Sequence, residues 1–212
     1  MSRPPAPPVP FPTAYWVEPG RLLAGDRPCR ASAEATAARH QALLAAGIRR
    51  LICLLEPHEM AEGPGGTPAG SRAGSPGSYD EQAWRAAGQA AGLAVAWESF
   101  PIPDFGVPSE AHLEAILDAI DAALARGEGV YVHCWGGIGR TGTVVGAWLA
   151  HHGRAGGEEA LTKLADLRRA TATAAFPSPE TEAQRALVRR WPPRPSVRPP
   201  ADKDEERGQR PR

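Results

Sequence analysis

The segment "GVYVHCWGGIGRTG" (residues 129–142) joins strand-forming residues to a glycine-rich turn that ends in arginine and threonine. β-Branched and aromatic residues bounded by glycines predict a short buried strand over 130–133. The turn that follows leads into a stretch predicted to be helical over 141–152. Cys134 therefore stands where a buried strand ends, directly before the turn and the helix.

Strands and helices alternate along the rest of the chain. Helices are predicted over 32–47, 79–91, 109–126, 141–152, 157–169 and 179–190. Strands are predicted over 49–56, 93–100 and 130–133, with two shorter strands around the Pro19-Gly20 turn. For the last helix, Ser178 is the expected cap and Pro179 the expected first helical residue. This alternation predicts an α/β fold with a mostly parallel central sheet of about four to five strands and helices on both faces.

Composition separates one folded domain from its ends. A chain of 212 residues has room for one ordinary domain, which we assign to residues 13–191. The segments 1–12 and 192–212 are rich in proline and charge, so we expect both to be disordered. Residues 62–78 have the same character and are expected to form a flexible insertion within the domain.

The charge balance argues against several classes of function. Lysine plus arginine equals aspartate plus glutamate at 24 each, which indicates no nucleic-acid or membrane partner. No leader and no run of roughly 18 apolar residues is evident, so we expect a cytoplasmic protein. The three cysteines are an odd number without regular spacing, and the six histidines show no metal-ligand spacing. We therefore expect neither disulfides, nor a metal, nor another cofactor.

The cysteine turn has the chemistry of an anion site. In parallel sheets, ligands bind beyond the carboxyl ends of the strands, and Cys134 lies at such an end. Backbone N–H groups that converge in a glycine-rich turn, together with a helix N-terminus, hold an oxyanion and stabilise a thiolate. The residues expected to form this cradle are Trp135, Gly136, Gly137, Ile138, Gly139 and Arg140.

Three side chains of this segment are assigned roles by their chemistry. Arg140 can bind two oxygens of a phosphate through its planar guanidinium. Thr141 can offer a hydroxyl to the sulfur when the sulfur leaves. His133 is expected to face away and to order the loop by hydrogen bonding rather than to transfer protons.

The residues "HCWGGIGRTG" resemble the H-C-x5-R-[ST] signature of the cysteine-dependent protein tyrosine and dual-specificity phosphatases. The resemblance implies that Cys134 attacks phosphorus to give a phosphocysteine intermediate, which water then hydrolyses. It also implies a phosphorylated protein as substrate and an aspartic acid on a separate loop that protonates the leaving alcohol. The chain lacks the longer tyrosine-recognition segment of the larger tyrosine-specific branch, so we expect the compact dual-specificity type. The loop lacks the lysines with which family members bind inositol phosphates, which disfavours a polyanionic lipid.

Two further residues are candidates on this resemblance. Asp104 follows the strand predicted at 93–100 and is flanked by proline and glycine, as suits a mobile acid loop. Its alternative is a solvated turn carboxylate. Gln184 in "SPETEAQ" resembles the glutamine that positions water for the second step, and its alternative is an exposed helix residue.

Other interpretations stay open at this stage. Trp135 either packs against the domain, which is favoured, or contacts an aromatic substrate. Cys53 is either a small buried residue, which is favoured, or a redox partner of Cys134. The alternatives to a phosphatase are a rhodanese-type sulfurtransferase and a catalytically silent phosphoresidue-binding module. We expect a monomer.

Overall fold

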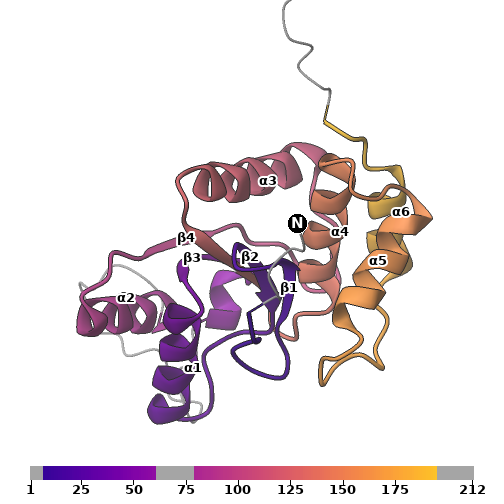
Figure 1. Cartoon of the computed structure of the whole chain (residues 1–212). Helices are drawn as coiled ribbons and strands as arrows, with labels where there is room; N and C mark the ends of the chain where they lie inside the picture. Colours follow the sequence, from indigo (N-terminus) through magenta and orange to yellow (C-terminus); the bar gives the residue numbers. More distant parts are fainter. Residues whose placement is uncertain (1–6, 61–78, 195–212) are drawn as a thin grey trace, which may run out of the picture.

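A computed structural model describes residues 7–60 and 79–194, which form an α/β domain around one five-stranded sheet (Figure 1). The strands are β1 (Tyr15–Glu18), β2 (Leu22–Gly25), β3 (Ile48–Cys53), β4 (Ala96–Ser99) and β5 (Gly129–His133), in the order β1-β2-β5-β3-β4. β1 pairs antiparallel with β2, and all other neighbours are parallel. The predicted mostly parallel sheet is confirmed, with its strand count at the upper bound.

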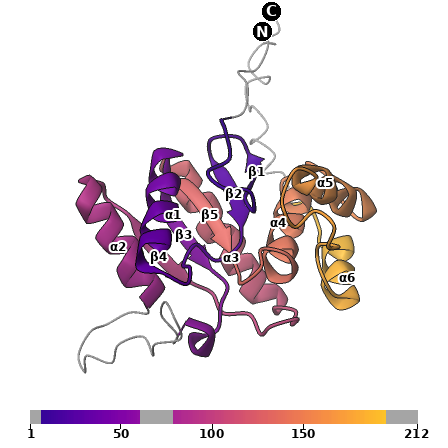
Figure 2. The same cartoon turned by 90° about the horizontal axis from the view of Figure 1, so that it is seen from below.

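Helices cover both faces of this sheet, as predicted (Figure 2). They are α1 (Ala33–Ala45), α2 (Tyr79–Ala91), α3 (Glu110–Ala125), α4 (Gly139–His151), α5 (Glu158–Arg168) and α6 (Glu182–Arg190), with a 3-10 turn η1 (Pro57–Met60). α1 and α2 lie on one face, and the other four helices lie on the opposite face. Each face has its own cluster of buried apolar side chains.

The central strand β5 supplies side chains to both clusters. Val130 and Val132 pack toward α3 and α4, whereas Tyr131 packs toward α1 and α2, and all three are fully buried. Burying each such side chain stabilises the fold by about 1.5–3 kcal/mol. Helix α4 is buried from Gly139 to Ala150. The loop between β5 and α4 is thus anchored in the core at both ends.

The register of the strands brings their carboxyl ends to one edge of the sheet. Gly25 of β2 and Cys53 of β3 both pair with His133 of β5, and Cys53 also pairs with Ser99 of β4. The segments that leave these four strands therefore meet at the same edge. This edge is where ligands bind in parallel sheets.

Residues 7–12 correct the expectation of a disordered N-terminal segment. Phe11 is 7% exposed and packs edge-on against Tyr131, with centroids 5.9 Å apart, and under the guanidinium of Arg39. The carbonyl of Pro12 accepts a hydrogen bond from the Ala172 amide. The free energy gained by burying the Phe11 ring is enough to order this segment despite its proline-rich composition. Residues 1–6 and the insertion 62–78 lie outside the described residues.

The carboxyl end differs from the predictions in two places. α6 begins at Glu182, where Thr181 caps it and forms a capping box with Gln184, so the predicted start at Pro179 with Ser178 as cap is wrong. The hydroxyl of Ser178 instead donates to the carbonyl of Ile138 (2.7 Å). Order also extends past the predicted boundary, since the Arg194 amide donates to the carbonyl of His151. Residues 195–212 lie outside the described part of the chain.

None of the helices in the described ranges is both long enough and apolar enough to cross a bilayer.

Replacing Phe11 by alanine should lower the free energy of unfolding by about 3 kcal/mol, because it leaves a cavity beside Tyr131. Urea unfolding monitored by circular dichroism measures the change. Val9→Ala is the matched control, since Val9 is 46% exposed, and it should change stability by less than about 0.5 kcal/mol. Equal stability of the Phe11→Ala variant and the wild type would show that residues 7–12 are not part of the folded domain.

Candidate active site

The loop after β5 forms an uncapped helix N-terminus beside a cysteine. Cys134 is 3% exposed and directly follows the last residue of β5. α4 begins five residues later, and no side chain caps its first turn. The N–H groups of an uncapped first turn are available to an anion, and the helix dipole favours negative charge there. Residues 135–140 thus lie between Cys134 and an open helix N-terminus, and phosphate binding by these residues stays a prediction.

Position 137 of this loop requires glycine, both for its backbone conformation and for the space around it. Its φ is +70°, and a Cβ there would collide with the carbonyl carbon of Gly25 and lie 2.6 Å from the amide nitrogen of Asp26. The loop thus rests directly on the backbone that leaves β2. Gly136 is different, since a methyl group placed there would have a terminal carbon of Ile138 as its nearest neighbour, at 3.7 Å.

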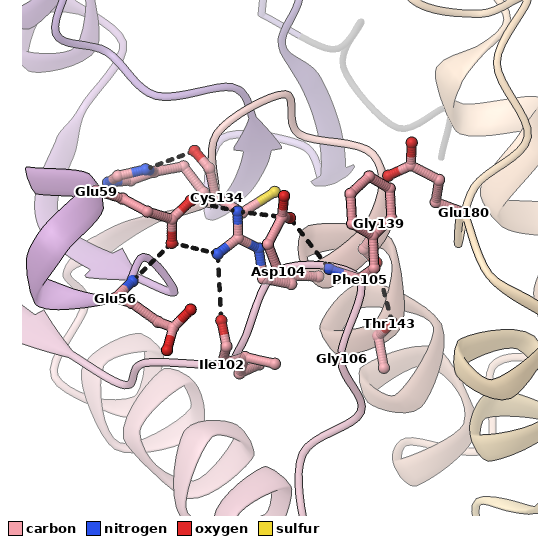
Figure 3. Close-up of polar contacts among 12 residues, drawn as sticks. Glu56, Glu59, Ile102, Asp104, Phe105, Gly106, Cys134, Gly139, Thr143 and Glu180 are labelled. Carbon is pink, nitrogen blue, oxygen red and sulfur yellow. Dashed lines mark hydrogen bonds and ion pairs between the residues drawn. The ribbon is translucent and has the colours of Figure 1, made fainter.

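Arg140 is buried, with only 2% of its side chain exposed, and three acceptors hold its guanidinium (Figure 3). Glu59 accepts two hydrogen bonds, at 2.5 and 2.8 Å, and the carbonyl of Ile102 accepts one at 3.1 Å. Asp104 forms an ion pair with the same group at 3.0 Å. Burial alone would lower the pKa of Arg140, but Glu59, Cys134 and Asp104 raise it. The guanidinium is therefore a fixed cation in the cradle.

Glu59 is a site residue that the sequence analysis missed. It lies on η1, and its carboxylate also accepts a hydrogen bond from the amide of Glu56 (2.8 Å). Burial raises its pKa, but the hydrogen bonds from Arg140 and Glu56 outweigh burial and keep the pKa below its usual value. The available signal was that "EPHEM" follows a buried strand and so must lie at the same sheet edge as Cys134.

Asp104 lies on the loop between β4 and α3, at the mouth of the site. Its side chain is 56% exposed, and its carboxylate accepts a hydrogen bond from the amide of Phe105 (3.1 Å). Phe105 has a φ of 55°, which a bulky residue rarely adopts, and the residue is 57% exposed. Asp104 is thus an exposed turn carboxylate that also pairs with Arg140, and its role as the acid stays a prediction.

His133 and Thr141 are both fully buried. Nδ1 of His133 lies 3.2 Å from the carbonyl oxygen of Cys134, and burial lowers the pKa of His133 to about 4. A neutral ring that donates from Nδ1 holds the start of the loop in place, as expected for an ordering residue. The hydroxyl of Thr141 makes no hydrogen bond to another described residue.

Gln184 is fully buried, so the alternative of an exposed helix residue is wrong. Its Oε1 accepts from the amides of Glu180 and Thr181 (both 3.1 Å), and its Nε2 donates to the carbonyl of Gly106 (3.0 Å). A methyl group on Gly139 would lie 3.3 Å from this Nε2. Gln184 therefore borders both the phosphate cradle and the loop that carries Asp104.

Trp135 was expected to pack against the domain, but the residue is 54% exposed, so this expectation is wrong. The guanidinium of Arg27 lies 5.0 Å from the ring centroid, and the Arg27 amide donates to the Trp135 carbonyl (3.0 Å). Arg27 in turn pairs with Asp80. Neither Arg27 nor Asp80 was predicted from the sequence to lie near the site.

Cys53 is fully buried and contacts the thioether of Met60, at an S–S distance of 3.6 Å. Burial raises the pKa of its thiol. The favoured interpretation, a small buried residue, is confirmed, and all three cysteines are free thiols. Across residues 7–60 and 79–194, no group of three or more histidine, cysteine or carboxylate side chains is arranged to hold a metal ion.

Comparison with known sequences points to phosphatases. A family model described as "Polymorphic toxin system, DSP-PTPase phosphatase" matches residues 27–154, which is more than half of the chain. Two uncharacterized proteins of Methanocaldococcus jannaschii are 42% and 40% identical to this chain over 53 residues, or 25% of the chain. These matches span 36% and 33% of the lengths of those relatives.

Solved structures of phosphatases share the fold. Tk-PTP in its active form is 26% identical, with a TM-score of 0.57, and the alignment covers 84% of this chain and 95% of that chain. PTPMT1 in complex with PI(5)P is 19% identical, with a TM-score of 0.58 and coverage of 84% and 94%. Kinase associated phosphatase is 18% identical, with a TM-score of 0.57 and coverage of 79% and 82%. At under 25% identity, the last two show the fold alone.

Gly137→Ala should weaken the binding of tungstate by about tenfold or more, because a Cβ at this φ strains the loop and collides with the Gly25 backbone. Isothermal titration calorimetry measures the dissociation constant. Gly136→Ala is the matched substitution one residue earlier, and it should weaken binding much less. Similar losses in the two variants would mean that the contact with Gly25 does not shape the cradle.

Proposed function

The chain belongs to the DSP-PTPase phosphatase family of polymorphic toxin systems, and from this premise we propose that it hydrolyses phosphomonoesters in proteins through a phosphocysteine intermediate. Phosphotyrosine is the proposed substrate, with phosphoserine and phosphothreonine as the second class in keeping with the dual-specificity type. The observation that carries the proposal is the buried Arg140, held by Glu59 at the open N-terminus of α4, in the loop that Cys134 begins. No metal is required in this scheme.

The first step transfers the phosphoryl group to sulfur. The phosphate dianion binds to the loop amides and to two N–H groups of Arg140, at Nε, which has no partner among the described residues, and at the side of Nη2 that faces Asp104. These groups stabilise the charge on its equatorial oxygens. The thiolate of Cys134 attacks phosphorus, so that an S–P bond forms while the P–O bond to the substrate breaks. Asp104, protonated once the bound phosphate has replaced its carboxylate on Arg140, gives its proton to the departing oxygen, which leaves as an alcohol or phenol.

The second step releases phosphate. The carboxylate of Asp104 takes a proton from a water molecule as this water attacks phosphorus, and the S–P bond breaks. The hydroxyl of Thr141, which has no described partner, stabilises the leaving thiolate. We assign to Gln184 the placement of this water: one N–H of Nε2 is bound to Gly106 and the other remains to hold it.

The alternatives receive less support. The family match is to phosphatases, so nothing favours a rhodanese-type sulfurtransferase. A catalytically silent binding module needs an anion cradle but no general acid, whereas the loop before α3 places a carboxylate, Asp104, beside Arg140. Turnover by the protein decides between this module and an enzyme.

We expect the wild-type protein to hydrolyse p-nitrophenyl phosphate in the presence of EDTA, and Cys134→Ser to abolish turnover because serine is not ionised at neutral pH. Arg140→Lys should lose most of the activity, since an ammonium cannot bind two oxygens in one plane or keep both bonds to Glu59. Release of p-nitrophenolate measures both effects. Undiminished turnover by Cys134→Ser would refute the proposed mechanism.

Asp104→Asn should slow the hydrolysis of an alkyl phosphate by roughly 10² to 10⁴, the range that general acids contribute. The loss with p-nitrophenyl phosphate should be smaller, because p-nitrophenolate leaves without a proton. Asp118→Asn is the matched control, as this carboxylate is similarly exposed (66%) but lies on α3. If the alkyl phosphate were hydrolysed at the wild-type rate by the Asp104 variant, another residue would have to be the acid.

A further inference from the structure

Trp135 occupies an unusual position for an exposed tryptophan. It directly follows Cys134 in the chain, and the residue is 54% exposed. Tryptophan side chains are highly buried on average, because their large apolar surface is costly to leave in water. An exposed indole next to a nucleophile therefore calls for an explanation in terms of binding rather than packing.

The ring is held in place rather than left free. The guanidinium of Arg27 lies over the indole, 5.0 Å from its centroid, at a distance typical of a cation–π contact. The backbone N–H of the same arginine donates to the carbonyl of Trp135 (3.0 Å). One residue thus fixes both the main chain and the side chain of Trp135.

Arg27 is itself immobilised by a buried carboxylate. Asp80, at the start of α2, is fully buried and accepts hydrogen bonds at 2.6 and 2.7 Å from two nitrogens of Arg27. This two-point contact fixes the plane of the guanidinium and hence the face that it presents to the indole. Because Asp80 balances its charge, Arg27 adds little net attraction for a second phosphate. The Arg27–Asp80 pair instead keeps the planar, apolar ring of Trp135 ordered beside the cradle.

We propose that Trp135, held by the Arg27–Asp80 pair, is a specificity residue that stacks on the aromatic ring of the phosphorylated group. This contact favours aryl over alkyl phosphomonoesters, and thus phosphotyrosine over phosphoserine in a protein. The inference rests on the proposed phosphatase function and adds to it the residue that selects the substrate. This role accounts for the exposed side chain of Trp135, whose backbone belongs to the predicted cradle.

The test compares phenylphosphonate with methylphosphonate, which carry the same non-hydrolysable anion and differ in the ring. Titration calorimetry at a pH where both are dianions gives their affinities, and inorganic phosphate serves as a probe without a ring. The wild type should bind phenylphosphonate more tightly than methylphosphonate. In Trp135→Ala this preference should fall by roughly three- to tenfold, the range of aromatic pair contacts, while phosphate affinity changes much less.

Two more variants separate stacking from general support of the loop. Trp135→Phe retains a ring and should keep most of the preference. Arg27→Lys retains the charge opposite Asp80 but lacks a planar face, so it should lower the preference in part without removing the loop amide contact. Thermal unfolding shows whether each variant is folded. If Trp135→Ala is unfolded, the preference for phenylphosphonate is compared between Arg27→Lys and Trp135→Phe instead.

Three results would overturn the inference. The first is an unchanged preference in Trp135→Ala. The second is an equal loss of phosphate and both phosphonates, which would make the indole a support of the loop only. The third is loss of the preference in Phe105→Ala instead, since Phe105 is another exposed ring next to a site residue. None of these bears on turnover by the wild type and by Cys134→Ser, so failure of the proposed function is recognised separately.

Discussion

The buried ion pair between Arg140 and Glu59 holds the site together. A guanidinium that is 2% exposed needs compensating acceptors, since an unpaired buried charge is strongly destabilising. The acceptors come from separate segments: Glu59 follows β3, and Ile102 and Asp104 follow β4. One cation at the start of α4 therefore gathers the segments that leave two neighbouring strands. The sheet brings these segments to the same edge, and the arginine determines how they meet.

The site combines fixed and accessible groups. The strand and helix on either side of the cradle are buried, and Gly137 rests on the Gly25 backbone, so the loop has little room to change shape. By contrast, the Asp104 side chain is 56% exposed and sits on a loop tied to the rest of the domain by Gln184. Electrostatic stabilisation works best from groups that are ordered in advance, whereas a proton donor must let the substrate enter and leave.

Local patterns predicted most of the fold and part of the site. The strand, the glycine turn and the helix around Cys134 are close in sequence, and the rule for carboxyl ends of parallel strands placed Cys134 at a ligand-binding edge. Asp104 was joined to this site only through the resemblance to the phosphatases. Glu59 was missed because its partner Arg140 is 81 residues away, and the Arg27–Asp80 pair because its members are 53 residues apart. Such contacts depend on side-chain packing that no local pattern encodes. The predicted start of α6 was wrong because Ser178-Pro179 fits the pattern of a helix start as well as the observed capping box of Thr181 and Gln184 does.

The N-terminal segment has a practical consequence. Trp16 donates its indole N–H to the carbonyl of Pro7 (2.8 Å), and the carbonyl of Pro12 binds Ala172 in the loop after α5. Residues 7–12 thus connect β1 with the loop that follows α5. An expression vector should accordingly leave these residues intact and attach any affinity tag or protease cleavage site upstream of Pro7. A truncation chosen from composition alone would remove Phe11 and expose the ring of Tyr131 to solvent.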